Sequence, residues 1–130
     1  IKMISYREIM EKLKEKRLKI VIEDRKGKGA RDYGIHNHGE FIAYINPADK
    51  DPWDVIIPGY RDHLPVGKYF MSNEIMAIMI VPSKNHKFFM RVNYPGFDPD
   101  KAQKDIQKYV SNYQKINKMK AFLKFPKMKN

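Results

Sequence analysis

The chain has 130 residues and a formal net charge of +11. Its length is that of one domain and excludes two independent hydrophobic cores. Hydrophobic residues make up 42% of the chain and aromatic residues 12%, values that argue against intrinsic disorder. The lack of cysteine excludes disulfides and thiolate metal sites, and no apolar run approaches the roughly 20 residues of a membrane span. We therefore expect one cytoplasmic domain covering residues 1–130, with no membrane association.

The charge is concentrated at the two ends of the sequence. Residues 1–31 hold 11 Lys and Arg against 5 Asp and Glu, residues 101–130 hold 9 against 1, and residues 32–100 hold 6 against 9. Basic ends around an acidic centre suggest an anionic partner, of which nucleic acid is one example. The alternative is that the lysines form a solvated surface, which is the commoner role of such runs.

In chain order, the first predicted element is a helix over about residues 5–17. Ser5 and Glu8 have the spacing of a capping box, and apolar residues follow at helical spacing. Asp98 and Pro99 have the form of an N-cap and the first position of a second helix, which extends to about Asn117. Strands are predicted where apolar and polar residues alternate or where apolar residues run together: 18–23, 41–45, 53–57, 75–81, 87–92 and 119–125.

These elements predict an α+β fold. Five or six short strands and two helices that do not alternate regularly argue against a doubly wound parallel sheet. We expect a small, mostly antiparallel barrel of five to six strands, with its core over about residues 18–125. Residues 126–130 would form a basic tail.

The segment NPADKDPWDVIIPG, residues 46–59, places Asp49, Asp51 and Asp54 within six positions of an otherwise basic chain. Two carboxylates about 5 Å apart repel by roughly 3 kcal/mol at an effective dielectric constant of about 20, so a fixed group of them favours a bound cation. Oxygen ligands without His or Cys favour Mg²⁺, or Mn²⁺ in its place. The alternative is a plain surface turn, for which Asp-Pro pairs are common.

The motif DKDPWDV, residues 49–55, resembles the aspartate signature of the family I soluble inorganic pyrophosphatases. The segments IVIEDRKGKG, RDYG and KYVSNYQKIN are similar to other elements of that family and occur in the same order, so the resemblance spans about residues 20–125. It implies that the barrel is of the pyrophosphatase-like or OB-like kind. It also implies Mg²⁺-dependent hydrolysis of diphosphate or a related phosphoanhydride.

The resemblance also implies a role for individual residues. Asp49, Asp51 and Asp54 would bind the metal, with Asp51 and Asp54 as the catalytic pair, and Glu23 would support the site. The phosphate contacts it implies come from basic and tyrosine side chains: Lys26, Lys28, Tyr33, Lys87 and Tyr113. The chain lacks two further aspartates that the family carries on the hairpin at residues 82–86, so we expect one or two weakly held ions.

A second interpretation is a protein with the same barrel fold that has lost its catalytic activity and binds an anionic partner. In it, the basic ends and exposed aromatic residues such as Tyr33, Tyr44 and Tyr60 hold nucleic acid or another anionic partner by charge and stacking. We interpret His36 and His38 as solvated loop residues, because two histidines without a third ligand do not make a metal site. His86 is expected to be exposed, where it could contact phosphate.

Overall fold

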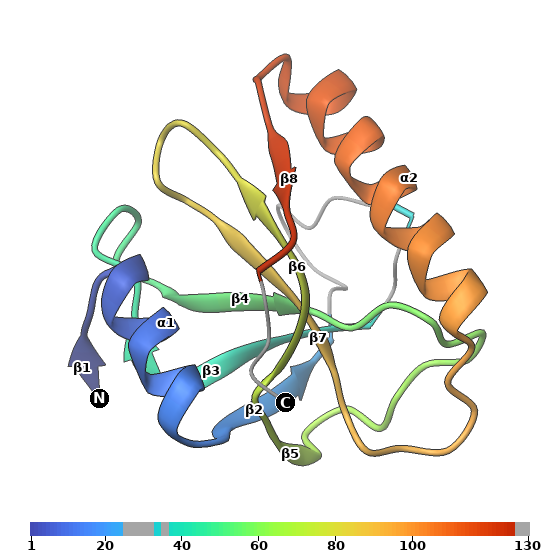
Figure 1. Ribbon diagram of the computed structural model, residues 1–130, viewed down its shortest axis with the longest axis horizontal. Coiled ribbons are helices and arrows are strands. Elements are labelled where there is room, and N and C mark those ends of the chain that lie inside the picture. The colour runs from blue at the N-terminus through green and yellow to red at the C-terminus, as the bar shows by residue number, and fades with distance from the viewer. Residues whose placement is uncertain (25–32, 35–36, 127–130) are drawn as a thin grey trace.

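A curled β-sheet with a helix packed on each face forms the framework of the computed structural model, which describes residues 1–24, 33–34 and 37–126 (Figure 1). The helices are α1 (Tyr6–Glu15) and α2 (Pro99–Asn117). The strands are β1 (Lys2–Met3), β2 (Leu18–Glu23), β3 (His38–Ile45), β4 (Pro52–Ile56), β5 (Tyr69–Ser72), β6 (Glu74–Ile80), β7 (Lys87–Arg91) and β8 (Phe122–Lys124).

The predicted α+β class is confirmed. The described strands form one mixed sheet in the order β5-β2-β3-β4-β7-β6-β8, with β1 beside β3, and five of its seven pairings are antiparallel. The sheet curls into a half-barrel, and its two sides are joined where β5 runs into β6 with only Asn73 between them. The predicted number of strands was too low, because β1 and β5 have two and four residues and carry little periodic signal.

Both helices begin where local side chains satisfy free backbone N–H groups. At α1, the backbone N–H of Glu8 donates to Ser5 Oγ at 3.2 Å and that of Ser5 donates to Glu8 Oε1 at 3.1 Å, which is the predicted capping box. At α2, the Asp98 carboxylate accepts from the backbone N–H groups of Asp100 and Lys101. Neither helix in the described part of the chain has the length and apolar character that a membrane span requires.

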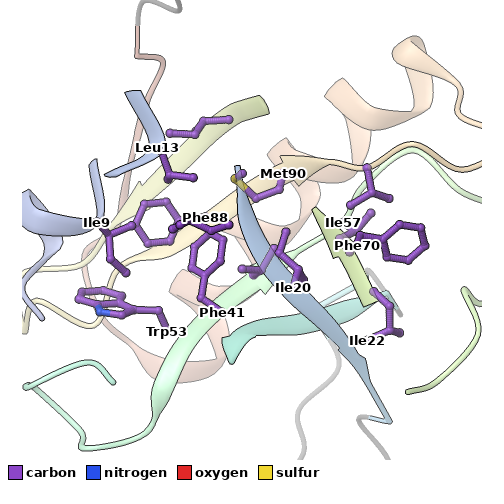
Figure 2. Packing of buried hydrophobic residues seen from close by; sticks show 14 of the residues in the cluster. Ile9, Leu13, Ile20, Ile22, Phe41, Trp53, Ile57, Phe70, Phe88 and Met90 are labelled. Carbon is purple, nitrogen blue, oxygen red and sulfur yellow. The ribbon is translucent and has the colours of Figure 1, made fainter. Parts of the chain in front are cut away.

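Two apolar layers lie on opposite faces of the sheet. Inside the curl, Ile9 and Leu13 of α1 pack with residues such as Phe41 and Phe88 (Figure 2). On the outer face, α2 packs over residues of β4, β6 and β7, including Phe89. Strands covered on both faces read as nearly continuous apolar sequence, which is why 75–81 lacks an alternating pattern. The outer face of β2 and β3 carries the polar residues described next.

Candidate functional site

An acidic cluster occupies the outer face of the sheet. We use this name for five side chains from four strands: Glu23 on β2, His38 and Glu40 on β3, Asp54 on β4 and Lys87 on β7. Their chain neighbours, such as Ile22, Phe41, Trp53 and Phe88, point into the core inside the curl. Because successive side chains of a strand point to opposite faces, the five polar residues must share the outer face.

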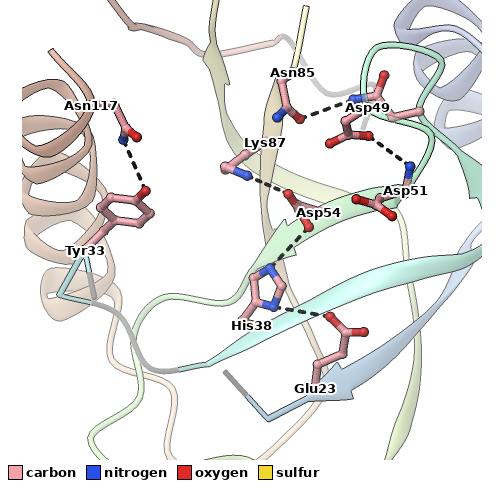
Figure 3. A network of polar contacts seen from close by, with 10 residues as sticks. Glu23, Tyr33, His38, Asp49, Asp51, Asp54, Asn85, Lys87 and Asn117 are labelled. Atoms are coloured by element: carbon pink, nitrogen blue, oxygen red, sulfur yellow. Dashed lines mark hydrogen bonds and ion pairs between the residues drawn. The ribbon is translucent and has the colours of Figure 1, made fainter. Parts of the chain in front are cut away.

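Asp54 is the centre of the cluster (Figure 3). Lys87 Nζ donates a hydrogen bond to Asp54 Oδ2, and His38 Nε2 lies 3.3 Å from Asp54 Oδ1. The other ring nitrogen of His38 lies 3.4 Å from Glu23 Oε2. Burial alone would raise the pKa of Asp54, but the hydrogen bond from His38 and the charge of Lys87 outweigh it and hold this pKa well below its usual range. Asp54 is therefore ionised throughout the physiological pH range.

Glu40 has the opposite behaviour. It lies directly across from Asp54 in the β3–β4 register, and like charges in that position destabilise a sheet. Burial, followed by the charge and hydrogen bond of Glu23 and the charges of Asp54 and Asp51, raises the pKa of Glu40 to about 7. Glu40 therefore exchanges a proton near neutral pH, while Asp54 beside it stays charged.

Replacing Glu40 with glutamine is expected to raise the free energy of unfolding by about 1 kcal/mol at pH 8, and by much less at pH 5. The pKa of Glu40 in the folded state, about 7, exceeds the ordinary glutamate value of 4.5, so the folded state binds the proton more tightly. Wild-type stability is consequently lost as the pH rises from about 4.5 through 7, and the neutral glutamine escapes this loss. Urea unfolding at the two pH values measures the difference, with the surface variant Glu15→Gln as control. An equal effect at both pH values would contradict the shifted pKa.

The three aspartates of the 46–59 segment do different things in this structure. Asp49 Oδ1 accepts a hydrogen bond from the backbone N–H of Asp51 at 3.0 Å within the turn, whereas Asp54 is engaged by Lys87 and His38. Over residues 1–24, 33–34 and 37–126, no three His, Asp or Glu side chains are placed as a group that could hold a metal ion. A metal site shared by the three aspartates therefore remains a prediction.

Of the other residues implied by the resemblance, Glu23, Asp54 and Lys87 come together in the acidic cluster. Tyr33 and Tyr113 also meet, with ring centroids 5.2 Å apart, but both are buried. Asn117 Nδ2 donates to Tyr33 Oη at 3.1 Å (Figure 3). Their phosphate contacts stay predictions, and Lys26, Lys28 and His36 lie outside the described residues.

The prediction of exposed stacking aromatics was wrong for two of the three residues named. Tyr33 and Tyr60 are 6% and 5% exposed, and the Tyr60 hydroxyl donates to the backbone carbonyl of Tyr94 at 2.7 Å. Tyr44 is half-buried, with Lys12 Nζ 5.5 Å from its ring centroid. The nucleic-acid interpretation thereby loses most of the stacking residues on which it relied.

Two members of the acidic cluster, His38 and Glu40, were missed or misread in the sequence. His38 was interpreted as a solvated loop residue, but it lies on β3 and its side chain is 15% exposed. The cause is that β3 begins three residues before the predicted start at Phe41. The available signal was the alternation of His38, Gly39, Glu40 and Phe41. Gly39 allows close strand contact, because a Cβ there would lie 2.4 Å from the carbonyl oxygen of Val21.

His86 was also misread, as an exposed residue. It is 9% exposed, and its Nδ1 accepts a hydrogen bond from the backbone N–H of Val81 at 3.0 Å. Its ring packs edge-on against Tyr6, with centroids 4.8 Å apart. The hairpin between β6 and β7 thus folds this side chain back against α1, and its contact with phosphate stays a prediction.

Comparisons with known proteins do not assign the chain to a family. No protein-family model matches the sequence, and no curated protein matches it. A similar solved structure is the crystal structure of an inorganic pyrophosphatase from Neisseria gonorrhoeae, which is 12% identical and superposes with a TM-score of 0.48 over 88% of this chain and 83% of that chain. A likeness at this level carries no argument about activity, so the pyrophosphatase resemblance remains a prediction from sequence motifs.

Proposed function

We propose that the acidic cluster is the acid–base centre of a hydrolase acting on diphosphate or a related phosphoanhydride. One feature supports this above all: Glu40 lies directly opposite Asp54 on the neighbouring strand, and their environments raise the pKa of Glu40 to about 7 while holding that of Asp54 low. Neighbouring carboxylates whose pKa values are driven apart are typical of acid–base sites. The motif resemblance of residues 49–55 supplies the class of substrate.

Three members of the cluster have a defined role in this proposal. Deprotonated Glu40 accepts a proton from the attacking water, whose oxygen bonds to phosphorus as the P–O–P bond breaks and phosphate leaves. Lys87 offsets the negative charge that develops on the phosphate oxygens. Asp54 acts as a positioning residue, because it holds both Lys87 and His38.

Magnesium enters the proposal as the counter-ion of the substrate. Glu23, Glu40 and Asp54 outnumber Lys87 and His38, so a bare diphosphate would meet net repulsion in the cluster, whereas its Mg²⁺ or Mn²⁺ complex would meet much less. The described side chains form no standing metal site, and Mg²⁺ is commonly carried by substrate phosphates and waters with few protein ligands. Bound to the substrate, the ion would neutralise phosphate charge.

The test is phosphate release from magnesium diphosphate. We expect the wild type to release phosphate, with a rate that rises as the pH passes through about 7, where Glu40 loses its proton. Glu40→Gln should lower kcat by about 100-fold or more, because a positioned general base contributes at least that factor. Glu15→Gln, which changes the same charge on the exposed face of α1, should leave the rate unchanged. The proposal would be refuted if the wild type released phosphate no faster than an enzyme-free blank with Mg²⁺ or Mn²⁺. Equal rates for Glu40→Gln and the wild type would refute it as well.

A further inference from the structure

A cleft of about 600 Å³ lies on the opposite side of the strands that carry the acidic cluster. Its walls are the start of α1, the turn at residues 46–48 and the hairpin between β6 and β7. Its volume falls within the range of about 300–1,000 Å³ that small-molecule sites occupy. Among the residues that the structure describes, none lining this cleft is acidic, whereas Arg7 and Lys84 each bring a positive charge. The cleft therefore favours an anion.

The rest of the lining is largely apolar and aromatic, and includes Tyr6, Pro47 and Trp53. The hydroxyl of Tyr6 is buried and has no hydrogen-bond partner among the described residues. Burial raises the pKa of this hydroxyl, so it keeps its proton and remains a donor at neutral pH. Tyr6 lines the cleft, and a buried hydroxyl without a partner is destabilising, so an acceptor bound within reach of this hydroxyl would stabilise the protein.

The walls of the cleft are held in place by internal hydrogen bonds. Asn46 is buried; its Nδ2 donates to Asn85 Oδ1 at 3.3 Å and its Oδ1 accepts from the backbone N–H of Ala48 at 2.9 Å. His86 Nδ1 accepts from the backbone N–H of Val81, so the neutral ring carries its proton on Nε2. Burial and then the charge of Lys84 lower the pKa of His86, which favours that neutral form. The site is largely pre-formed, as ligand sites commonly are.

We propose that this cleft binds a small organic anion, with a phosphate or carboxylate group beside Arg7 and Lys84 and a ring or similar apolar body against Tyr6 and Pro47. The two cations account for the anionic group. The apolar lining accounts for the organic body, because an inorganic anion would leave those side chains unused. Trp53 and His86 line the cleft, whereas their chain neighbours Asp54 and Lys87 face the acidic cluster. The sheet thus separates the two sites, and binding here does not depend on the proposed hydrolysis.

Trp53 is the sole tryptophan of the chain and lines the cleft, so its fluorescence reports on binding. We expect a saturable change on titration with phenyl phosphate, and with benzoate if a carboxylate serves equally well. Inorganic phosphate should bind at least tenfold more weakly than phenyl phosphate, a difference of about 1.4 kcal/mol. Phenol, which has the ring without the charge, should be similarly weak.

Arg7→Ala combined with Lys84→Ala should weaken phenyl phosphate at least tenfold. The matched control, Lys19→Ala with Arg61→Ala, removes the same charge from residues outside the cleft and should bind as the wild type does. Tyr6→Phe should weaken binding without lowering the melting temperature, because the hydroxyl that it removes has no partner among the described residues. The proposal would be overturned if the Trp53 fluorescence showed no saturable change with millimolar phenyl phosphate or benzoate. It would also be overturned if the Arg7→Ala, Lys84→Ala variant and its control bound phenyl phosphate with equal affinity.

Discussion

Replacing Asp54 with asparagine is expected to lower the free energy of unfolding by about 3 kcal/mol, because removing one partner of a buried ion pair leaves the other charge uncompensated. Lys87 is the charge left behind, and its side chain is only 11% exposed. His38 loses its second carboxylate contact in the same change. For a chain of this length the melting temperature should fall by about 10 °C. Urea unfolding at pH 7 and a thermal melt measure the two effects.

The matched control is Asp49→Asn, in the same acidic segment. Asp49 is exposed and its Oδ1 accepts a hydrogen bond from the backbone N–H of Asp51, which an asparagine oxygen can accept equally well. We expect its stability to stay within about 0.5 kcal/mol of the wild type. Equal losses for the two variants would mean that the Asp54–Lys87 pair does not hold the cluster together. Asp54→Asn should also slow the proposed hydrolysis, because it releases Lys87 and His38.

Replacing Phe88 with alanine is expected to cost about 4 kcal/mol of unfolding free energy, through lost burial and the cavity that remains. Phe88 is fully buried inside the curl, and its ring lies 5.6 Å from that of Phe41, 5.8 Å from that of Trp53 and 6.0 Å from that of Tyr6. It also pairs with Val55 where β4 and β7 run parallel. The change therefore weakens α1, the sheet and the non-local β4–β7 contact together.

Phe122→Ala is the control for this prediction, because it deletes the same side chain from β8, where the residue is 55% exposed. A loss below about 1 kcal/mol is expected there. Urea unfolding followed by Trp53 fluorescence measures both variants, and circular dichroism checks that each one folds. Similar losses at the two positions would show that the interior of the curl is not the main source of stability.

The local elements could be predicted from the sequence wherever their signals lay within a few residues. The capping box at Ser5 and the Asp98-Pro99 start of α2 are such signals, and both helices begin where these residues predict. Strand β2 was predicted with its observed bounds, Leu18–Glu23, because its apolar residues alternate regularly. Strand β1 has only two residues and is held by parallel pairing with β3, so its own sequence contains too little pattern to predict it.

The candidate site could be predicted only in part. Asp54 and Lys87 were named from the motif resemblance, and the structure places them in contact. Glu40 carried no motif of its own, because its shifted pKa comes from burial and from the charges of Glu23 and Asp54 on the two neighbouring strands. Which carboxylates face one another depends on the register of three strands, and register is not written in any one of them.

The two helices, most strands and the α+β class followed from the sequence alone, because they depend on periodicity and capping within a short stretch of chain. Three features became visible only in the folded protein: β4 and β7 lie side by side as parallel strands, the sheet curls into a half-barrel, and Glu40 faces Asp54. Each of these features joins residues that are far apart in the chain. The energy of such a contact depends on the distance and burial reached after folding, and a local sequence pattern contains neither.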